Sequence, residues 1–132
     1  MADQTSITIR ISPGEVLDRL TILEIKSERM TDSDKLANVR LELKELAAVV
    51  AKTIPVRDDI KALHMEIKAI NAKLWEIEDD IRDCERGDDF SGKFVALARA
   101  VYVTNDERSR VKRRINEALG SDLIEEKSYK PY

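Results

Sequence analysis

The sequence has little glycine, proline, cysteine or histidine, and each shortage argues against a class of fold or of functional site. Four Gly and three Pro in 132 residues leave few breaks, which favours long helices over a loop-rich fold. The single Cys84 excludes an internal disulfide, and its place on an apolar stripe indicates a small buried hydrophobe. The single His64 has no Ser or Cys placed to use it, and no zinc spacing or phosphate-binding glycine loop occurs. We therefore expect no catalytic residue, no metal site and no cofactor.

Long hydrophobic runs are also missing. No apolar run approaches the roughly 18 residues that a membrane span needs, and the N-terminus lacks the basic start and apolar stretch of a signal peptide. We therefore expect a cytoplasmic protein with no membrane contact. Charge is what the chain has in excess, since 37% of its residues are charged and its net charge is -3. This content is typical of long solvated helices, and the length predicts a single helical domain, 1–132.

Hydrophobic periodicity predicts one strand and four helices. Residues 5–11, TSITIRI, alternate between apolar and polar with period two, as a short half-buried strand does. Such a strand needs a pairing partner, either the tail segment 123–129 or the same segment of a second subunit. Ser12, Pro13 and Glu15 then form the signature of a helix start. The apolar spacing and the turn residues predict helices at about 13–30, 33–53, 57–86 and 90–119, followed by an extended tail, 121–132.

The predicted helix 57–86 carries a seam with a 3.5-residue period, which favours coiled-coil-like packing. Four helices with short connections imply an all-α fold, an antiparallel four-helix bundle with a long coiled-coil-like hairpin and one short N-terminal β-strand. Segments 57–86 and 90–119 form the hairpin, whose far end should project beyond the shorter helices and expose an apolar seam. A homodimer is the simplest cover for that seam, and we therefore expect one. A different protein partner is also compatible with the pattern.

Glu24 falls inside the apolar arc of the first predicted helix, so facing helices should bring it hydrogen-bond donors. If the long hairpin turns near residue 88, Asn71 faces Asn105, and the other turns bring Glu24 to the same height. One layer of the bundle then holds Glu24, Arg40, Asn71, Thr104, Asn105 and Arg108.

Two interpretations of this polar layer stay open. In the structural interpretation, the two asparagines hydrogen-bond to each other and Glu24 pairs with Arg108, which fixes helix register at a cost in stability. In the functional interpretation, the layer is a small polar pocket lidded by Trp75 and Tyr102. That pocket would bind an anionic or polar ligand through Arg108 and Asn105.

Two further patterns give alternative functions. Acids three residues apart, Glu42 with Glu45 and Glu76 with Asp79, resemble the carboxylate pairs with which all-α nucleoside triphosphate pyrophosphatases hold magnesium. A magnesium-dependent nucleotide pyrophosphatase would draw its carboxylates from Glu24, Glu42, Glu45, Glu76, Glu78 or Asp79. The basic block RSRVKRR, residues 108–114, suggests nucleic-acid binding as a third function. Its five bases spread around the helix with no alternating aromatic residues, so nucleic acid is not the expected partner.

Several motifs together resemble an uncharacterised bacterial family of small helical proteins. They are SPGEVLDRLTILEIKSERM, DKLANVRLEL, LWEIEDDIR, LARAVYVTNDERSRVKRRIN and GSDLIEEKSY, and the similarity covers about residues 6–129. The resemblance implies no established activity, but it implies an association with tetratricopeptide-repeat and sugar-transfer proteins. The motif positions it adds as candidates are Glu24, Trp75, Glu78, Asp79, Tyr102, Asn105, Asp106 and Arg108.

The leading hypothesis is a non-catalytic binding or assembly module, a dimeric helical bundle linked to bacterial surface-polysaccharide synthesis through the resemblance alone. Its predicted ligand-binding residues are Glu24, Asn71, Trp75, Glu78, Tyr102, Asn105, Asp106 and Arg108.

Overall fold

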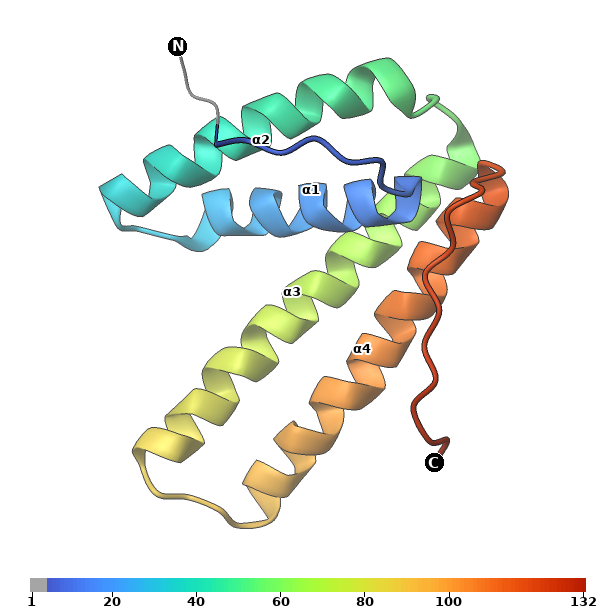
Figure 1. Ribbon diagram of the computed structural model, residues 1–132. Coiled ribbons are helices and arrows are strands. Elements are labelled where there is room, and N and C mark those ends of the chain that lie inside the picture. Colours follow the sequence, from blue (N-terminus) through green and yellow to red (C-terminus); the bar gives the residue numbers. More distant parts are fainter. Residues whose placement is uncertain (1–4) are drawn as a thin grey trace.

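A computed structural model describes residues 5–132, and these residues form four helices (Figure 1). The helices are α1 (Pro13–Arg29), α2 (Ser33–Thr53), α3 (Asp58–Arg86) and α4 (Gly92–Ala118). The prediction of an all-helical fold with four helices is confirmed, and each helix ends within two residues of its predicted boundary.

Local sequence signals account for the helix ends. The Ser12 side chain accepts a hydrogen bond from the Glu15 backbone N–H at 3.2 Å, and Pro13 occupies the first helical position, where no N–H is needed. The Asp32 carboxylate caps α2 in the same way by accepting from the Lys35 N–H at 3.0 Å. At the C-terminal end of α3, the backbone N–H of Gly87 donates to the Asp83 carbonyl, which closes the last turn.

Helix α1 lies at the centre of the fold, because it packs against α2, α3 and α4 while α2 packs closely against α1 alone. Helices α3 and α4 lie side by side, and α1 and α2 cross them near the beginning of α3 (Figure 1). The turn between α3 and α4 therefore projects away from α1 and α2, as expected for the longest hairpin. The main cluster of buried apolar side chains comprises Leu17, Leu20, Ile60, Leu63, Ile67, Ile70, Val111 and Ile115.

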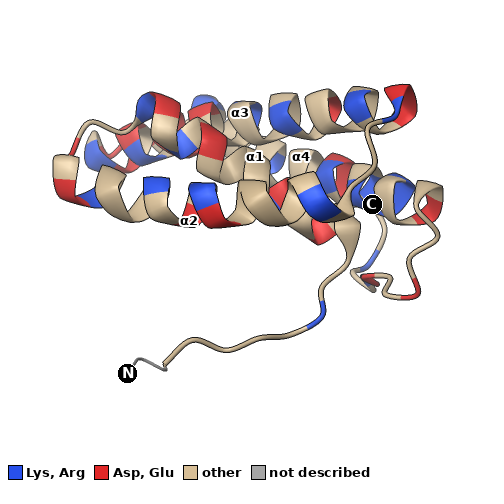
Figure 2. Cartoon of the chain, turned by 90° about the horizontal axis from the view of Figure 1, so that it is seen from above, with Lys and Arg blue, Asp and Glu red and all other residues tan. Residues whose placement is uncertain are grey.

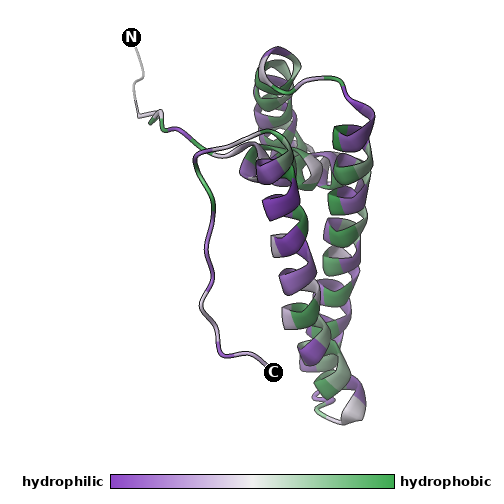
Figure 3. Ribbon diagram, turned by 90° about the vertical axis from the view of Figure 1, so that its right-hand side faces the viewer, coloured by the Kyte–Doolittle hydropathy of each residue, from purple (hydrophilic) through white to green (hydrophobic). Residues whose placement is uncertain are grey.

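The strand predicted at 5–11 does not form in this chain, since no strand occurs in residues 5–132. The arm, residues 5–12, and the tail, residues 121–132, run outside the helices without regular secondary structure (Figure 3). They approach each other through side chains, and the Arg10 guanidinium donates to the Asp122 carboxylate at 2.8 Å. A strand needs a backbone ladder, and the tail does not supply one to the arm.

Charged residues are distributed over all four helices (Figure 2). Apart from Asp18 and Lys112, none of the charged residues that the structure describes is buried, and the core cluster is apolar, which explains how a chain with 37% charged residues packs a core. Among the described residues, no helix combines the length and the apolar character that crossing a membrane requires.

Candidate functional site

A polar network lies where α1, α3 and α4 meet, with Asn71 at its centre. The Asn71 Nδ2 donates to Asp18 Oδ1 at 2.8 Å and to Thr21 Oγ1 at 2.9 Å. From α4, Arg108 Nη1 donates to Asn71 Oδ1 at 3.5 Å, the limit of a hydrogen bond. Asp18, Thr21 and Asn71 are all buried, so their mutual hydrogen bonds compensate for lost water. Of the residues predicted to form a polar layer, Asn71 and Arg108 lie in this network, whereas its α1 members are Asp18 and Thr21, and Arg40 is exposed on α2.

Lys112 of α4 extends this network toward the beginning of α1. Only 7% of the residue is exposed, and its Nζ lies 2.8 Å from Glu15 Oε2, 3.1 Å from Glu125 Oε1 and 3.8 Å from Asp18 Oδ2. Burial acts to lower the pKa of Lys112, but the hydrogen bonds to Glu15 and Glu125 and the negative charges of Asp18 and Glu15 together hold the pKa above its ordinary value. The hydrogen bond from Lys112 lowers the pKa of Glu15 in turn. One buried ammonium thus ties together α1, α4 and the tail.

The beginning of α1 lies in direct contact with the backbone of α4. The Gly14 N–H donates to Asn116 Oδ1 at 2.7 Å, and Asn116 is 1% exposed. A Cβ on Gly14 would come within 2.4 Å of the Lys112 carbonyl oxygen, so only glycine fits at this position. The close approach fixes the position of α1, and with it the polar network.

Glu24 has neighbours other than those the sequence predicted. Its Oε1 lies 3.5 Å from His64 Nε2 and 3.8 Å from Lys68 Nζ, both on α3. The predicted pairing of Glu24 with Arg108 is therefore wrong, as is the predicted Asn71–Asn105 pair, because Asn71 donates to α1. The prediction assumed helices lying side by side, whereas α1 crosses α3 and meets it in a different register.

A groove opens on the outer side of the polar network, between α3 and its neighbours. Its volume is about 320 Å³, and we call it the tryptophan groove. It is lined by Ile22, Asn71, Leu74, Trp75, Glu78, Asp79, Arg82 and Arg108. Four of the eight predicted ligand-binding residues, namely Asn71, Trp75, Glu78 and Arg108, therefore line one groove.

The other predicted residues lie elsewhere. A separate hollow against the tail is lined by Tyr102 and Asp106. There the Tyr132 hydroxyl donates to Asp106 Oδ2 at 2.7 Å, and the Tyr132 ring packs edge-on against the Tyr102 ring. The Asp106 carboxylate raises the pKa of Tyr132. Asn105 and Glu24 are not among the lining residues of either hollow. Six of the eight predicted ligand-binding residues are thus divided between two hollows, and two lie in neither.

Three carboxylates of the pyrophosphatase alternative lie beside different basic side chains. Glu76 pairs with Arg29 at 3.6 Å, Glu78 pairs with Arg82 on its own helix, and Glu24 lies beside Lys68. Glu42 and Glu45 are exposed on α2, which packs against α1 alone. Across residues 5–132, no three His, Cys, Asp or Glu side chains gather closely enough to hold a metal ion.

The basic block 108–114 is largely neutralised by nearby acids. Lys112 is buried among carboxylates, Arg113 Nη1 lies 3.0 Å from Glu126 Oε1, and Arg114 Nη1 lies 3.0 Å from Glu66 Oε1. These pairs point the bases toward α3 and the tail, so they do not form one basic stripe.

Sequence reasoning missed Asp18, Thr21, Arg82 and Lys112. Asp18 and Thr21 share a face of α1 with Ile22 and Ile25, a second apolar face opposite the main one, and Ile25 is 2% exposed. That second face was the available signal for buried polar residues on α1. Lys112 gave no such signal, because a lysine within a basic block usually faces water.

No curated protein and no solved structure matches the chain. Residues 7–132 match the model of a family described as "Family of unknown function (DUF6165)". The match begins in the arm and continues through α1, the polar network, both hollows and the tail. The predicted membership of an uncharacterised family is thereby confirmed, and the chain belongs to DUF6165, a family of unknown function.

Proposed function

We propose that this protein is a non-catalytic binding module whose ligand occupies the tryptophan groove. The observation that carries the proposal is the composition of that groove, where one indole lies among two guanidinium groups, two carboxylates and an amide. Aromatic side chains with a few convergent polar groups are typical of small-ligand sites. Asn71 is held by Asp18 and Thr21, so the wall of the groove is already in place before a ligand arrives.

The chemistry of the groove favours a saccharide. Trp75, Leu74 and Ile22 offer apolar surface against which the C–H face of a sugar ring can pack. Glu78 and Asp79 accept hydrogen bonds and the arginines donate them, so neighbouring hydroxyl groups of a sugar find both kinds of partner. Two arginines against two acids leave the lining balanced in charge, which suits a neutral polar ligand better than a polyphosphate.

This ligand class agrees with the association with surface-polysaccharide synthesis that the motif resemblance implied. We therefore place the proposed module beside sugar-transfer proteins, in the cytoplasm. The pyrophosphatase alternative receives less support, since no three His, Cys, Asp or Glu side chains within residues 5–132 gather closely enough to hold a metal ion. Nucleic-acid binding receives less support because three of the five bases of 108–114 pair with acids.

Trp75 is the only tryptophan of the chain, so its fluorescence reports on the groove directly. Titration with a panel of neutral and acidic mono- and oligosaccharides should change its emission in a saturable way for at least one sugar. Arg82→Ala should weaken that binding about tenfold or more, the value of a hydrogen bond to a charged group. Arg86→Ala is the matched control, because it removes an exposed arginine one turn further along α3, outside the groove.

Both variants should keep the wild-type unfolding midpoint within a few degrees, because an exposed ion pair such as Arg82–Glu78 contributes about 0.2–1 kcal/mol. The proposal is refuted if no saccharide alters the emission of Trp75 at millimolar concentration. Equal weakening by Arg82→Ala and Arg86→Ala would also contradict it, since binding would then depend on charge in general.

A further inference from the structure

The arm has the alternating pattern of a strand, but no segment within residues 5–132 pairs with it. Ile7 and Ile9 are 87% and 71% exposed, although isoleucine is among the residue types most often buried. Within the described chain, the backbone groups of residues 6–11 make no hydrogen bond to other backbone groups. The arm leaves the body of the molecule in the view from above (Figure 2). It therefore offers an unpaired strand edge together with exposed apolar side chains, a combination that natural proteins usually cover.

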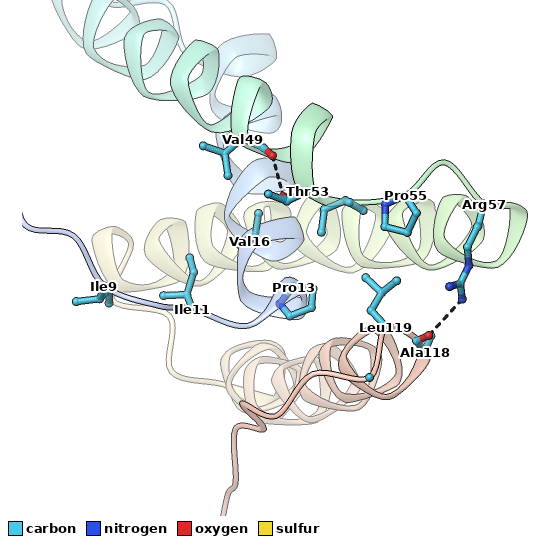
Figure 4. Close-up of a pocket in the computed structure, with 12 residues that line it drawn as sticks. Ile9, Ile11, Pro13, Val16, Val49, Thr53, Pro55, Arg57, Ala118 and Leu119 are labelled. Atoms are coloured by element: carbon cyan, nitrogen blue, oxygen red, sulfur yellow. Dashed lines mark hydrogen bonds between the residues drawn. The ribbon is translucent and has the colours of Figure 1, made fainter.

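An apolar groove lies at the base of the arm. Ile9 and Ile11 form one side of it, and Val49, Thr53 and Leu119 contribute to the remainder (Figure 4). Its volume is about 660 Å³, about twice that of the tryptophan groove. We call it the arm groove. Val49 is 47% exposed there, so apolar surface of α2 stays accessible beside the arm.

The arm sequence is complementary to itself. If two copies of residues 5–11 pair in antiparallel register about Thr8, Ile7 of each copy lies opposite Ile9 of the other, and the two Thr8 residues face each other. The same register places Ser6 opposite Arg10, so no two like charges meet. In a strand, alternate residues share a face, so Thr5, Ile7, Ile9 and Ile11 would lie on one face and polar residues on the other. Three of the four residues on the first face are isoleucines.

We propose that the occupant of this surface is a second copy of the chain, and that residues 5–11 form a two-stranded antiparallel ribbon across a two-fold axis at Thr8. Ile9 lines the arm groove of its own copy, and Ile7 of the second copy lies opposite it and extends the apolar cover. A ribbon of two strands is marginal in water by itself, so burial of its isoleucines over the two arm grooves supplies the remaining stabilisation. The strand that the sequence predicts thus forms only in the dimer.

This inference does not depend on the tryptophan groove, which shares no lining residue with the arm groove. Light scattering or sedimentation at tens of micromolar should give twice the 15.1 kDa mass of one chain. Ile7→Lys should give the mass of a single chain, because it removes an apolar cross-strand pair twice per dimer. Met65→Lys is the matched control, since Met65 of α3 is 74% exposed and lies outside the arm groove. A wild-type monomer, or a dimer that survives Ile7→Lys, would overturn the proposal.

A cross-linking experiment tests the register. Directly opposite residues in an antiparallel pair have Cα atoms about 4.5–5.5 Å apart, within the range of a disulfide. In a Cys84→Ala background, Thr8→Cys should therefore join two copies under mild oxidation. Ser6→Cys is the control on the same face of the strand, because the two Ser6 Cα atoms would lie about 14 Å apart. Equal cross-linking at both positions, or none at Thr8→Cys, would overturn the register.

Discussion

Gly14→Ala gives the sharpest test of how α1 is held against α4. In most helices this substitution stabilises the protein, because alanine exceeds glycine in helix propensity by about 1 kcal/mol. At Gly14 the new Cβ would lie 2.4 Å from the Lys112 carbonyl oxygen and 2.9 Å from Asn116 Oδ1. The first contact is with backbone, which cannot rotate away. We therefore expect the effect of the substitution to have the opposite sign.

The magnitude follows from two costs and one gain. Ordinary contact begins at 3.4 Å, so α1 must move away from α4 by about 1 Å, and overpacking of this kind costs about 1–3 kcal/mol. The movement also stretches the buried 2.7 Å hydrogen bond from the Gly14 N–H to Asn116, whose loss costs about 1–3 kcal/mol. After subtraction of a propensity gain of about 1 kcal/mol, the expected net loss is about 3 kcal/mol, within a range of about 1–5 kcal/mol.

Urea unfolding followed by circular dichroism at 222 nm measures this loss as a lower midpoint at an unchanged slope. Gly92→Ala is the matched control, because Gly92 opens α4 and a Cβ there would have nothing within 4 Å. The control should be neutral or more stable than wild type by up to about 1 kcal/mol. A Gly14→Ala variant as stable as Gly92→Ala would refute the close approach of α1 and α4.

Two further predictions concern the polar network. Asn71→Leu should lower the free energy of unfolding by about 1–3 kcal/mol, because it leaves buried oxygens of α1 without their donor. The control Asn38→Leu, on the exposed face of α2, should change the free energy of unfolding by less than about 0.5 kcal/mol. Equal urea midpoints for the two variants would contradict this prediction. In the folded protein the pKa of Glu15 lies below its ordinary value of 4.5. The Glu15–Lys112 pair should therefore stabilise the fold fully above about pH 4.5, and this contribution should be lost as the pH falls through the pKa of Glu15 in the folded state. Midpoints measured from pH 7 to pH 3 should therefore fall less steeply for Glu15→Gln, and parallel curves would refute the assignment.

Helix positions followed from local signals that act within a few residues. The Ser12 cap, the proline after it and the 3.5-residue seam of 57–86 each depend on backbone hydrogen bonding or on side chains one turn apart, and all reappear in the structure. The strand at 5–11 was predicted by the same kind of signal and is absent from the single chain. Its alternation specifies which residues share a face, but a ladder requires a second segment that local sequence does not supply.

The candidate site shows the same division between local and tertiary information. The sequence by itself determined that polar residues would interrupt the apolar faces, and it nominated Asn71, Trp75, Glu78 and Arg108, which line one groove. Only the tertiary structure decided that Asp18, and not Glu24, meets Asn71, because that choice depends on the angle at which α1 crosses α3. The crossing is set by Gly14 against α4 and by packing between residues far apart in the chain, and helical periodicity carries no information about it.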